Sequence, residues 1–256
     1  MKISIIGGGA MGGALARGLA LNKHIPPFKI SVSNPHLVKI QDLEDHGIKI
    51  STDNKDIIDG ADVIVIAVKP WKVKEVIEEI KSVTPQTSAE WALIVAGIPS
   101  EELLKMFADK VPSNISIVMP NTAMTVNKSM TFIVPLNGNF HKTEEIFKLV
   151  GKVMVIDEKQ LPAAMALASC GIAFAMRYIR ALCEGGVELG FKASLAQEIV
   201  CETLKGAVAL LEQPDTHPES EIDKVTTPGG ITIRGLNTME KNGFSSSVIE
   251  GLKACR

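Results

Sequence analysis

The stretch Val225–Leu236, VTTPGGITIRGL, carries the residues of this chain that are best suited to holding a small anion. It interrupts a C-terminal half that otherwise has a helical pattern, because Pro228 lacks an amide donor and Gly229–Gly230 frees the backbone for positive φ. A new helix is predicted to begin at Ile231. Backbone N–H groups at a helix start, together with nearby threonine hydroxyls, attract anions. The sequence therefore predicts an anion-binding loop here.

A second chemically informative stretch lies near the N-terminus, where an apolar segment runs into a glycine-rich turn. Residues Lys2–Ile6 are predicted to form a buried parallel strand. The motif GxGxxG follows, with its glycines at Gly7, Gly9 and Gly12, and a helix is predicted over Ala14–Leu21. The first glycine allows a tight turn, the second lets a pyrophosphate approach the backbone, and the third lets helix and strand pack closely. This order favours dinucleotide binding over an ordinary glycine-rich turn.

The choice of cofactor depends on the end of the second predicted strand, Lys29–Ser33. An NAD-specific protein places an acidic residue there for the ribose 2′-hydroxyl, whereas this chain has Ser33 and Asn34 followed by Pro35. With no carboxylate to repel a 2′-phosphate, and with hydroxyl and amide donors available, the sequence favours NADPH over NADH. The same residues could cap a following helix over Leu37–Leu43, and both interpretations can hold together.

Further candidate residues lie at other strand ends, because ligands of open α/β sheets bind at the carboxyl ends of the strands. Asn54 and Lys55 could add donors for the same phosphate or could be exposed residues at a helix start. Lys69 could contact cofactor or substrate, or be a solvated residue. Strands are predicted at Val63–Ala67, Leu93–Ala96, Ile115–Met119, Thr131–Pro135 and Val153–Ile156. The predicted cofactor-binding residues are Gly7, Gly9, Ala10, Met11, Gly12, Ser33, Asn34, Asn54, Ala67, Val68, Lys69, Pro70, Ala96, Gly97 and Asn121.

Beyond Asp157 the strand-like pattern stops, and Ala, Met, Leu, Cys and Glu dominate. Helices are predicted at Pro162–Leu189 with a bend at Gly171, at Ser194–Leu211 with Ser194 as N-cap, and at Pro218–Lys224.

The chain is thus predicted to have an α/β fold in two domains. An N-terminal Rossmann dinucleotide-binding domain is expected over residues 1–158, and an all-helical dimerisation and substrate-binding domain over residues 159–256. The long apolar helices would leave apolar surface exposed in a monomer, so we expect a homodimer built on this second domain. Assembly into a higher homo-oligomer is left open.

Composition excludes several classes of protein. The 256 residues are 46% hydrophobic with a net charge of -2, which gives no signature of nucleic-acid binding. The N-terminus lacks a signal-peptide pattern, so we expect a cytoplasmic protein. The uncharged run at residues 162–176 is shorter than the roughly 20 residues that span a bilayer, so we expect no membrane partner. The four cysteines show no metal-binding spacing, and we expect reduced thiols and no metal site.

Over nearly its whole length the chain resembles the pyrroline-5-carboxylate reductases. The resemblance rests on the glycine loop with Met11, Ala67-Val68-Lys69-Pro70, Ala96-Gly97, Met119-Pro120-Asn121-Thr122, Glu184-Gly185-Gly186-Val187 and the loop Asp223–Thr232. It implies reduction of the cyclic imine 1-pyrroline-5-carboxylate to L-proline with NADPH or NADH. It also implies a Rossmann domain followed by a helical domain that dimerises by interleaving with its partner.

The chemistry of such a reaction agrees with the residues present. Hydride addition to a protonated imine carbon needs no strong nucleophile, but it needs a positioned substrate. The amides of Gly229 and Gly230 and the hydroxyl of Thr227 are predicted to hold the substrate carboxylate. Thr232 matches the family's substrate-contacting threonine, and we predict that it hydrogen-bonds the imine nitrogen as the catalytic residue. A helix cap with an ordinary turn is the structural alternative. We expect this loop to face a Rossmann crevice across the dimer.

The chain departs from the family pattern at three places. The stretch Ala168–Phe174 reads ASCGIAF where the family has SGSGPAY, Ala123 replaces a proline, and Pro35 stands where bacterial members often have an arginine. A reductase of another cyclic imine or small carbonyl acid therefore stays open. A β-hydroxyacid dehydrogenase is disfavoured, because the helix Pro162–Leu189 contains no lysine. A non-catalytic NADP-binding sensor is the alternative from another class.

Overall fold

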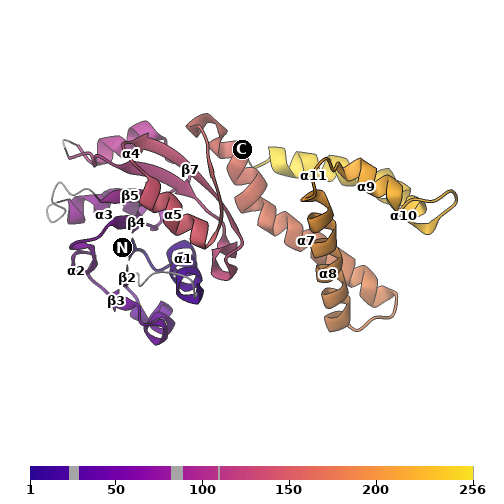
Figure 1. Cartoon of the computed structure of the whole chain (residues 1–256), viewed down its shortest axis with the longest axis horizontal. Helices are drawn as coiled ribbons and strands as arrows, with labels where there is room; N and C mark the ends of the chain where they lie inside the picture. The colour runs from indigo at the N-terminus through magenta and orange to yellow at the C-terminus, as the bar shows by residue number, and fades with distance from the viewer. Residues whose placement is uncertain (23–28, 82–88, 109, 256) are drawn as a thin grey trace. The chain divides into compact units, whose positions relative to one another are not determined.

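A computed structural model of the chain describes residues 1–22, 29–81, 89–108 and 110–255. The chain divides into two compact units, Met1–Ser169 and Cys170–Arg256, which run from indigo to magenta and from orange to yellow in Figure 1. The predicted domain boundary between residues 158 and 159 stays a prediction.

The first unit is built on one eight-stranded sheet in the order β3-β2-β1-β4-β5-β6-β7-β8. The strands are β1 Lys2–Ile6, β2 Lys29–Ser33, β3 Lys49–Ser51, β4 Val63–Ile66, β5 Glu90–Leu93, β6 Ile115–Met119, β7 Ser129–Asn137 and β8 Gly151–Val155. Neighbouring strands pair in parallel, except that β7 runs antiparallel to β6. The order of the first six strands is that of the doubly wound dinucleotide-binding fold, so the predicted Rossmann domain is confirmed.

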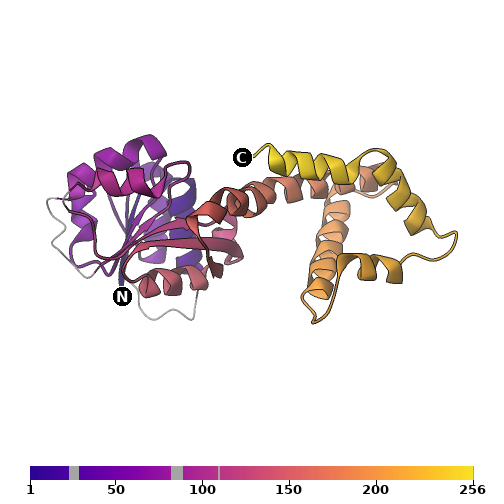
Figure 2. The same ribbon diagram turned by 90° about the horizontal axis from the view of Figure 1, so that it is seen from above.

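Helices cover both faces of this sheet (Figure 2). They are α1 Ala10–Leu21, α2 Lys55–Ile58, α3 Val73–Ile80, α4 Ser100–Met106 and α5 His141–Leu149. Leu15 of α1 and Phe147 of α5 belong to the buried core on one face. Ile77 of α3 and Leu103 of α4 belong to the core on the other. Each face of the sheet therefore buries its own layer of apolar side chains, as expected for a fold of this class.

The strand β5 lies three residues earlier than the sequence predicts. It spans Glu90–Leu93 instead of Leu93–Ala96. The prediction was wrong because a glutamate inside a buried strand is rare unless its charge is compensated. Here the Glu90 carboxylate is buried and accepts hydrogen bonds from the backbone N–H groups of Lys142 at 3.1 Å and Thr143 at 2.7 Å. The first turn of α5 thereby makes the charged residue acceptable within the sheet.

The helix predicted over Leu37–Leu43 is also wrong, since two short 3-10 segments, Leu37–Lys39 and Gln41–His46, take its place. Between them the fully buried Ile40 adopts φ -130°, which interrupts helical hydrogen bonding. The residue that precedes the first segment is His36, and no side chain caps it. The predicted caps in Ser33-Asn34-Pro35 are therefore not formed.

The second unit is helical, as predicted. It contains α7 Gly171–Glu188, α8 Ala193–Leu211, α9 Pro218–Lys224, α10 Ile231–Lys241 and α11 Phe244–Lys253. The single helix predicted over Pro162–Leu189 is interrupted, because the short α6, Leu161–Ala164, passes into a π-helical turn at Met165–Cys170 before α7. Ser194 is not the N-cap of α8, since the extended residue Lys192 takes that position and the helix begins at Ala193.

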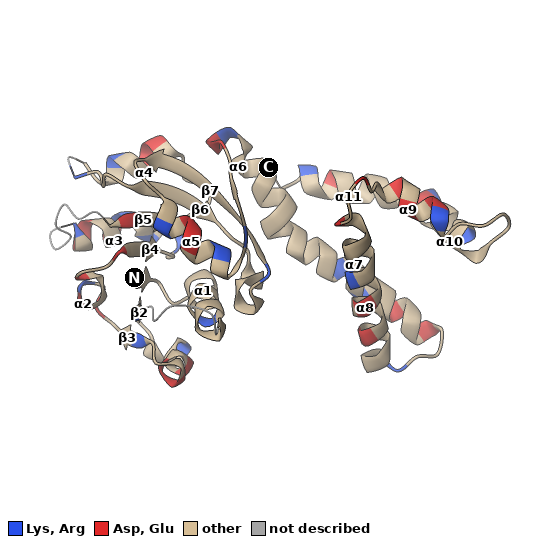
Figure 3. Ribbon diagram, viewed as in Figure 1, with Lys and Arg blue, Asp and Glu red and all other residues tan. Residues whose placement is uncertain are grey.

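The second unit has almost no core of its own. Ala196 is the one buried apolar residue among those described in Cys170–Cys255, whereas large apolar side chains such as Met176 and Ile199 are exposed. Figure 3 shows the start of α7 without charged residues.

By length and composition alone, the helical run Glu158–Glu188 could cross a membrane, although the uncharged run at residues 162–176 is shorter than a span.

Candidate functional site

The glycine loop after β1 has the geometry that dinucleotide binding requires. Gly7 has φ 99°, and a Cβ there would lie 2.6 Å from the carbonyl oxygen of Ala67. A Cβ on Gly12 would lie 2.1 Å from the carbonyl oxygen of Gly7, so α1 packs closely on the strand end. A Cβ on Gly9 would meet no atom within 4 Å. The loop is crowded where the fold needs glycine and open where a pyrophosphate would approach, so it fits the predicted cofactor.

The first turn of α1 faces the same opening. Gly9 is its N-cap residue, and no side chain caps the helix. Ala10 is exposed and Met11 is half-buried at the start of the helix. The N–H groups of a first helical turn have no intrahelical partner, and they carry the positive end of the helix dipole. This arrangement can bind a phosphate group through the backbone alone.

The predicted residues at the end of β2 lie together. Ser33 is fully buried, and its carbonyl oxygen accepts from the N–H groups of Gly7 at 2.9 Å and Gly8 at 3.1 Å. Its hydroxyl donates to Oδ1 of Asn54 at 2.6 Å. The amide of Asn34 donates to the carbonyl oxygen of His36 at 2.8 Å. The sequence therefore predicted residues that lie close together in the fold. It did not indicate that the side chains of Ser33, Asn34 and Asn54 form hydrogen bonds within the protein.

Two more strand ends lie at the same edge of the sheet, because β4 and β5 are parallel neighbours. Ala67 and Val68 follow β4 directly, and both contact the position that a Cβ on Gly7 would take. Lys69 is exposed and precedes a 3-10 turn that begins at Pro70. After β5, Ala96 and Gly97 are exposed, and Gly97 has φ 78°. The fold thus places these residues at the edge that the glycine loop borders.

Asn121 differs from the other predicted residues, because its side chain is buried and bonded within the protein. Its Oδ1 accepts from the N–H of Ala123 at 3.1 Å, and its Nδ2 donates to the carbonyl oxygen of Ala168 at 3.4 Å. The hydroxyl of Ser169 donates to the carbonyl oxygen of Pro120 at 3.3 Å. The loop after β6 therefore holds the π-helical turn. These contacts give Asn121 a structural task that its place in the sequence did not indicate.

In the second unit, a loop joins α9 to α10 (Figure 1), and it contains a hydrogen-bonded turn followed by an uncapped helix start. The N–H of Gly230 donates to the carbonyl oxygen of Thr227 at 2.9 Å, while Gly229 has φ 72°. With Pro228 before that glycine, the turn has the features of type II. Gly230 is the N-cap of α10, and no side chain caps the helix. The predicted helix start at Ile231 is confirmed.

Some polar groups of this loop are bonded within the protein, and others are open to a ligand. The hydroxyl of Thr226 donates to the carbonyl oxygens of Ile222 and Asp223 at 3.2 Å. The N–H of Gly230 is used inside the turn, so it does not serve a ligand in this conformation. Among the described residues, the hydroxyls of Thr227 and Thr232 and the N–H of Gly229 have no hydrogen-bond partner. Sequence reasoning missed Arg234, whose Nε donates to the carbonyl oxygen of Gly230 at 3.3 Å and which places a positive charge beside the loop.

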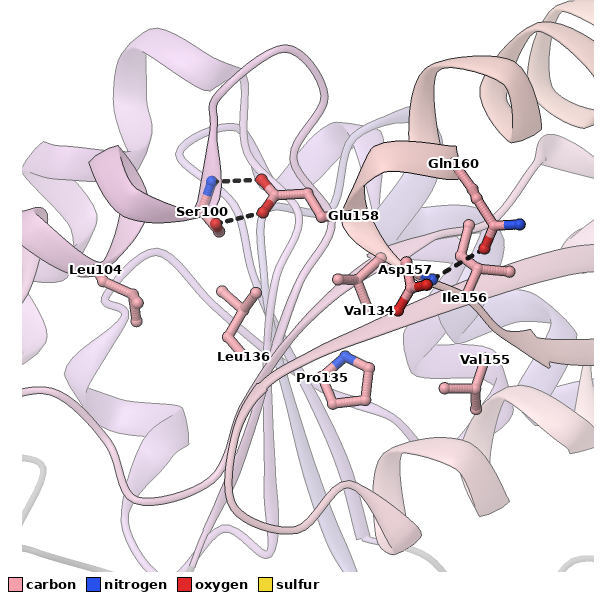
Figure 4. Close-up of a pocket in the computed structure, with 10 residues that line it drawn as sticks. All are labelled: Ser100, Leu104, Val134, Pro135, Leu136, Val155, Ile156, Asp157, Glu158 and Gln160. Atoms are coloured by element: carbon pink, nitrogen blue, oxygen red, sulfur yellow. Dashed lines mark hydrogen bonds between the residues drawn. The ribbon is translucent and has the colours of Figure 1, made fainter.

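A hollow of about 580 Å³ in the first unit contains none of the predicted site residues (Figure 4). It is lined by residues of β7, α4 and the segment after β8. Glu158 lies beside it and accepts from the N–H of Ser100 at 2.7 Å, which caps α4. Because Glu158 is bonded to Ser100, and Asp157 to Gln160, the hollow shows no chemistry of its own. We base the functional site on the strand ends and the loop instead.

The altered stretch Ala168–Phe174 includes Cys170. Burial raises the pKa of its thiol, and a hydrogen bond with Cys255 adds to the shift. The four cysteines are free thiols. Within the described ranges, no group of three or more His, Cys, Asp or Glu residues is arranged to hold a metal ion.

The doubly wound sheet, its open glycine loop and the helical second unit define a dinucleotide-binding oxidoreductase fold. Residues 158–256 match the family model described as pyrroline-5-carboxylate reductase dimerisation. Residues 2–94 match a model described as NADP oxidoreductase, coenzyme F420-dependent. Together with the relatives below, these matches show that the chain belongs to the pyrroline-5-carboxylate reductase family.

The similarity extends over the whole chain. Pyrroline-5-carboxylate reductase 2 of Dictyostelium discoideum is 37% identical over 268 residues, which cover 98% of this chain and 89% of the relative. The Synechocystis pyrroline-5-carboxylate reductase is 32% identical, with 99% and 95% of the two chains covered. The crystal structure of the Plasmodium falciparum pyrroline carboxylate reductase with NADP bound has a TM-score of 0.87 at 29% identity, with 100% and 95% covered.

Proposed function

We propose that this chain reduces 1-pyrroline-5-carboxylate to L-proline by hydride transfer from NADPH, or less favourably NADH, to the imine carbon. The observation that carries the proposal is the uncapped start of α10 behind a glycine turn, in a chain whose relatives bear this enzyme's name. A helix start with free N–H groups and threonine hydroxyls suits a small carboxylate. The solved relative with NADP supports the choice of cofactor.

We assign the cofactor to the glycine loop and the neighbouring strand ends. Gly7 and Gly12 shape the loop, and the backbone at Gly9, Ala10 and Met11 receives the pyrophosphate. The other proposed contacts are Ser33, Asn34, Asn54, Ala67, Val68, Lys69, Pro70, Ala96, Gly97 and Asn121. The bound nicotinamide supplies the hydride, and the protein's residues bind and orient both reactants.

We assign the substrate to the loop at the start of α10. The N–H of Gly229 and the hydroxyl of Thr227 hold the carboxylate, and the hydrogen bond from the N–H of Gly230 to the carbonyl oxygen of Thr227 keeps this turn in place. The hydroxyl of Thr232 bonds the ring nitrogen. Arg234 adds a positive charge at the same end of the helix. A carboxylate bound this way fixes the ring so that the imine carbon can meet the hydride.

The test is to mix the purified protein with NADPH and 1-pyrroline-5-carboxylate and to follow cofactor oxidation at 340 nm, with proline measured as product. Turnover confined to another cyclic imine would show that the altered stretch Ala168–Phe174 redirects substrate choice. Tight NADPH binding without turnover of any imine would favour the sensor instead. A Thr227→Ala variant should raise KM for the imine carboxylate, with the affinity for NADPH unchanged.

We also propose that the chain is a homodimer formed through its second unit. The matched dimerisation model and the exposed apolar side chains of α7 and α8 support this. A second copy of the chain, rather than lipid, would then cover the long apolar helix. Four free thiols agree with a reducing compartment, so we propose that the dimer works in the cytoplasm.

A further inference from the structure

The end of β2 has no acidic residue of its own, but the carboxylate of Glu79 on α3 lies close to it. Nδ2 of Asn54 donates to Oε2 of Glu79 at 2.8 Å, while Oδ1 of Asn54 accepts from the hydroxyl of Ser33 at 2.6 Å. Glu79 lies on α3 and is half-buried. The amide of Asn54 therefore links the hydroxyl at the end of β2 to a glutamate that lies 25 residues after Asn54 in the chain.

This hydrogen-bonded row of side chains, Ser33, Asn54 and Glu79, is connected to the glycine loop. The carbonyl oxygen of Ser33 accepts hydrogen bonds from the N–H groups of Gly7 and Gly8. The backbone N–H of the next residue, Asn34, donates to the carbonyl oxygen of Ser51 on β3 at 3.0 Å. The three polar side chains are thus held in a fixed position beside the predicted adenosine end of the cofactor site.

Within the part of the chain that the structure describes, no cation forms an ion pair with Glu79. The other two glutamates near it on α3 are paired, Glu75 with Lys72 at 2.7 Å and Glu78 with Lys81. Glu79 makes no ion pair with any described residue. On α1, the guanidinium of Arg17 is already bound to Asp42 at 2.6 Å. The end of β2 therefore lies close to an uncompensated negative charge.

The hydrogen-bonding pattern has a consequence for the ligand. The hydroxyl of Ser33, which is fully buried, and one N–H of Asn54 are both used as donors within the chain, so the group that stays available is the acceptor carboxylate of the half-buried Glu79. A ribose 2′-hydroxyl can donate to such acceptors. A 2′-phosphate brings only acceptors and further negative charge, which the carboxylate repels.

We propose that Glu79 is a specificity-determining residue that acts through Asn54 to reduce the preference for NADPH over NADH. This inference rests on the proposed cofactor site. Glu79 fixes the orientation of the Asn54 amide and supplies the carboxylate that NAD-binding proteins usually carry at the end of the second strand. The chain therefore uses NADH more readily than the sequence of β2 alone indicates.

The test compares the dissociation constants of NADPH and NADH by isothermal titration calorimetry, so that it does not depend on the imine. Glu79→Gln keeps an acceptor for Asn54 but removes the charge. It should lower the Kd of NADPH relative to that of NADH by about three- to thirty-fold, as expected for charges one side chain apart near the surface. Glu75→Gln is the matched control on the same helix, and it should leave the ratio of the two constants unchanged.

A Ser33→Ala variant separates the two ways in which this could fail. If Ser33→Ala weakens both cofactors while Glu79→Gln leaves the ratio of their constants unchanged, the role of Glu79 is overturned and the proposed site stands. If Ser33→Ala alters neither constant, the cofactor site itself is misplaced. Thermal unfolding of each variant shows whether it is folded. A Glu79→Asp variant with a wild-type ratio would further support charge as the cause.

Discussion

The two units of this chain handle their apolar residues in opposite ways. In Met1–Ser169 both faces of the sheet bury a continuous core, with side chains such as Phe107 and Phe147 almost completely enclosed. In Cys170–Arg256 only Ala196 is buried among the described apolar residues. Burial of apolar surface is the main force that offsets the loss of chain entropy on folding. The first unit thus has its own source of stability, whereas the second needs an additional surface to pack against.

The largest expected effect separates the two units. Residues 1–169 produced alone should unfold in one cooperative thermal transition whose midpoint does not depend on protein concentration. Residues 170–256 produced alone should be helical only when associated, so their helicity by circular dichroism should rise with concentration. A monomeric fragment 170–256 that melts cooperatively, with a midpoint independent of concentration, would break the comparison.

A second test adds charges to the exposed apolar surface. The double variant Met176→Glu with Ile199→Glu should raise the dissociation constant of the dimer by at least about 100-fold, because each buried apolar side chain contributes about 1.5–3 kcal/mol and the symmetry of a dimer counts it twice. Sedimentation equilibrium measures this constant. The control exchanges the charges of an exposed ion pair on α8, through Glu202→Lys with Lys205→Glu. A dimer unchanged by the double variant would place the interface elsewhere.

The proposed division of labour between the units predicts which kinetic constant each one controls. Thr232→Ala should lower kcat by roughly 10- to 1,000-fold, since it removes a hydrogen bond to the reacting imine, while the affinity for NADPH stays the same. Thr238→Ala is the matched control, because the hydroxyl of Thr238 donates to the carbonyl oxygen of Arg234 within the same helix. Steady-state kinetics with both variants decides this, and unchanged kinetics for Thr232→Ala would reduce Thr232 to a helix-start residue.

A further prediction concerns the buried carboxylate of Glu90, which contributes to the stability of the first unit. Glu90→Ala should destabilise the unit by about 1–3 kcal/mol, because the two N–H groups of α5 that it accepts would lose their partner inside the protein. Glu90→Gln should cost less, since its amide oxygen can still accept one of these bonds. Urea denaturation of the full chain gives the free energy of unfolding of each variant. Equal losses of this free energy in the two variants would argue against a capping role of Glu90.

The smallest expected effect concerns pH. The hydrogen bond from Lys142 at 2.6 Å, followed by that from the backbone N–H of Lys2 at 2.8 Å, lowers the pKa of Asp62. Because the folded-state pKa is the lower one, this carboxylate stabilises the fold above its ordinary pKa, and the stabilisation is lost as the pH falls through the lowered value. Asp62→Asn should therefore flatten the fall in stability below about pH 4. Asp45→Asn, at an exposed aspartate, is the control, and thermal midpoints across this range measure both.

The features that could be predicted from the sequence are those set by local chemistry. The bounds of β1, β2 and β6 agree with the prediction, because each has an apolar or alternating pattern and ends at turn-forming residues. The turn and helix start at Gly230 and Ile231 were likewise predictable, since proline and glycine restrict the backbone locally.

The features that could not be predicted depend on residues far apart in the chain. Nothing near Glu90 indicates that α5 would compensate its charge. In the same way, the contact of Asn54 with Glu79 and that of Asn121 with Ala168 join residues that only the folded sheet brings together. Long-range polar contacts of this kind leave no periodic pattern in a single sequence.

The buried carboxylate of Glu90 also constrains the order of events during synthesis. A nascent chain that has produced β5 cannot complete its sheet favourably until Lys142 and Thr143 have left the ribosome, since their N–H groups are the partners of that charge. We therefore expect β5 to join the sheet only after the first turn of α5 has been made. We expect the first unit to become stable as one cooperative body, shortly before the helices of the second unit are made.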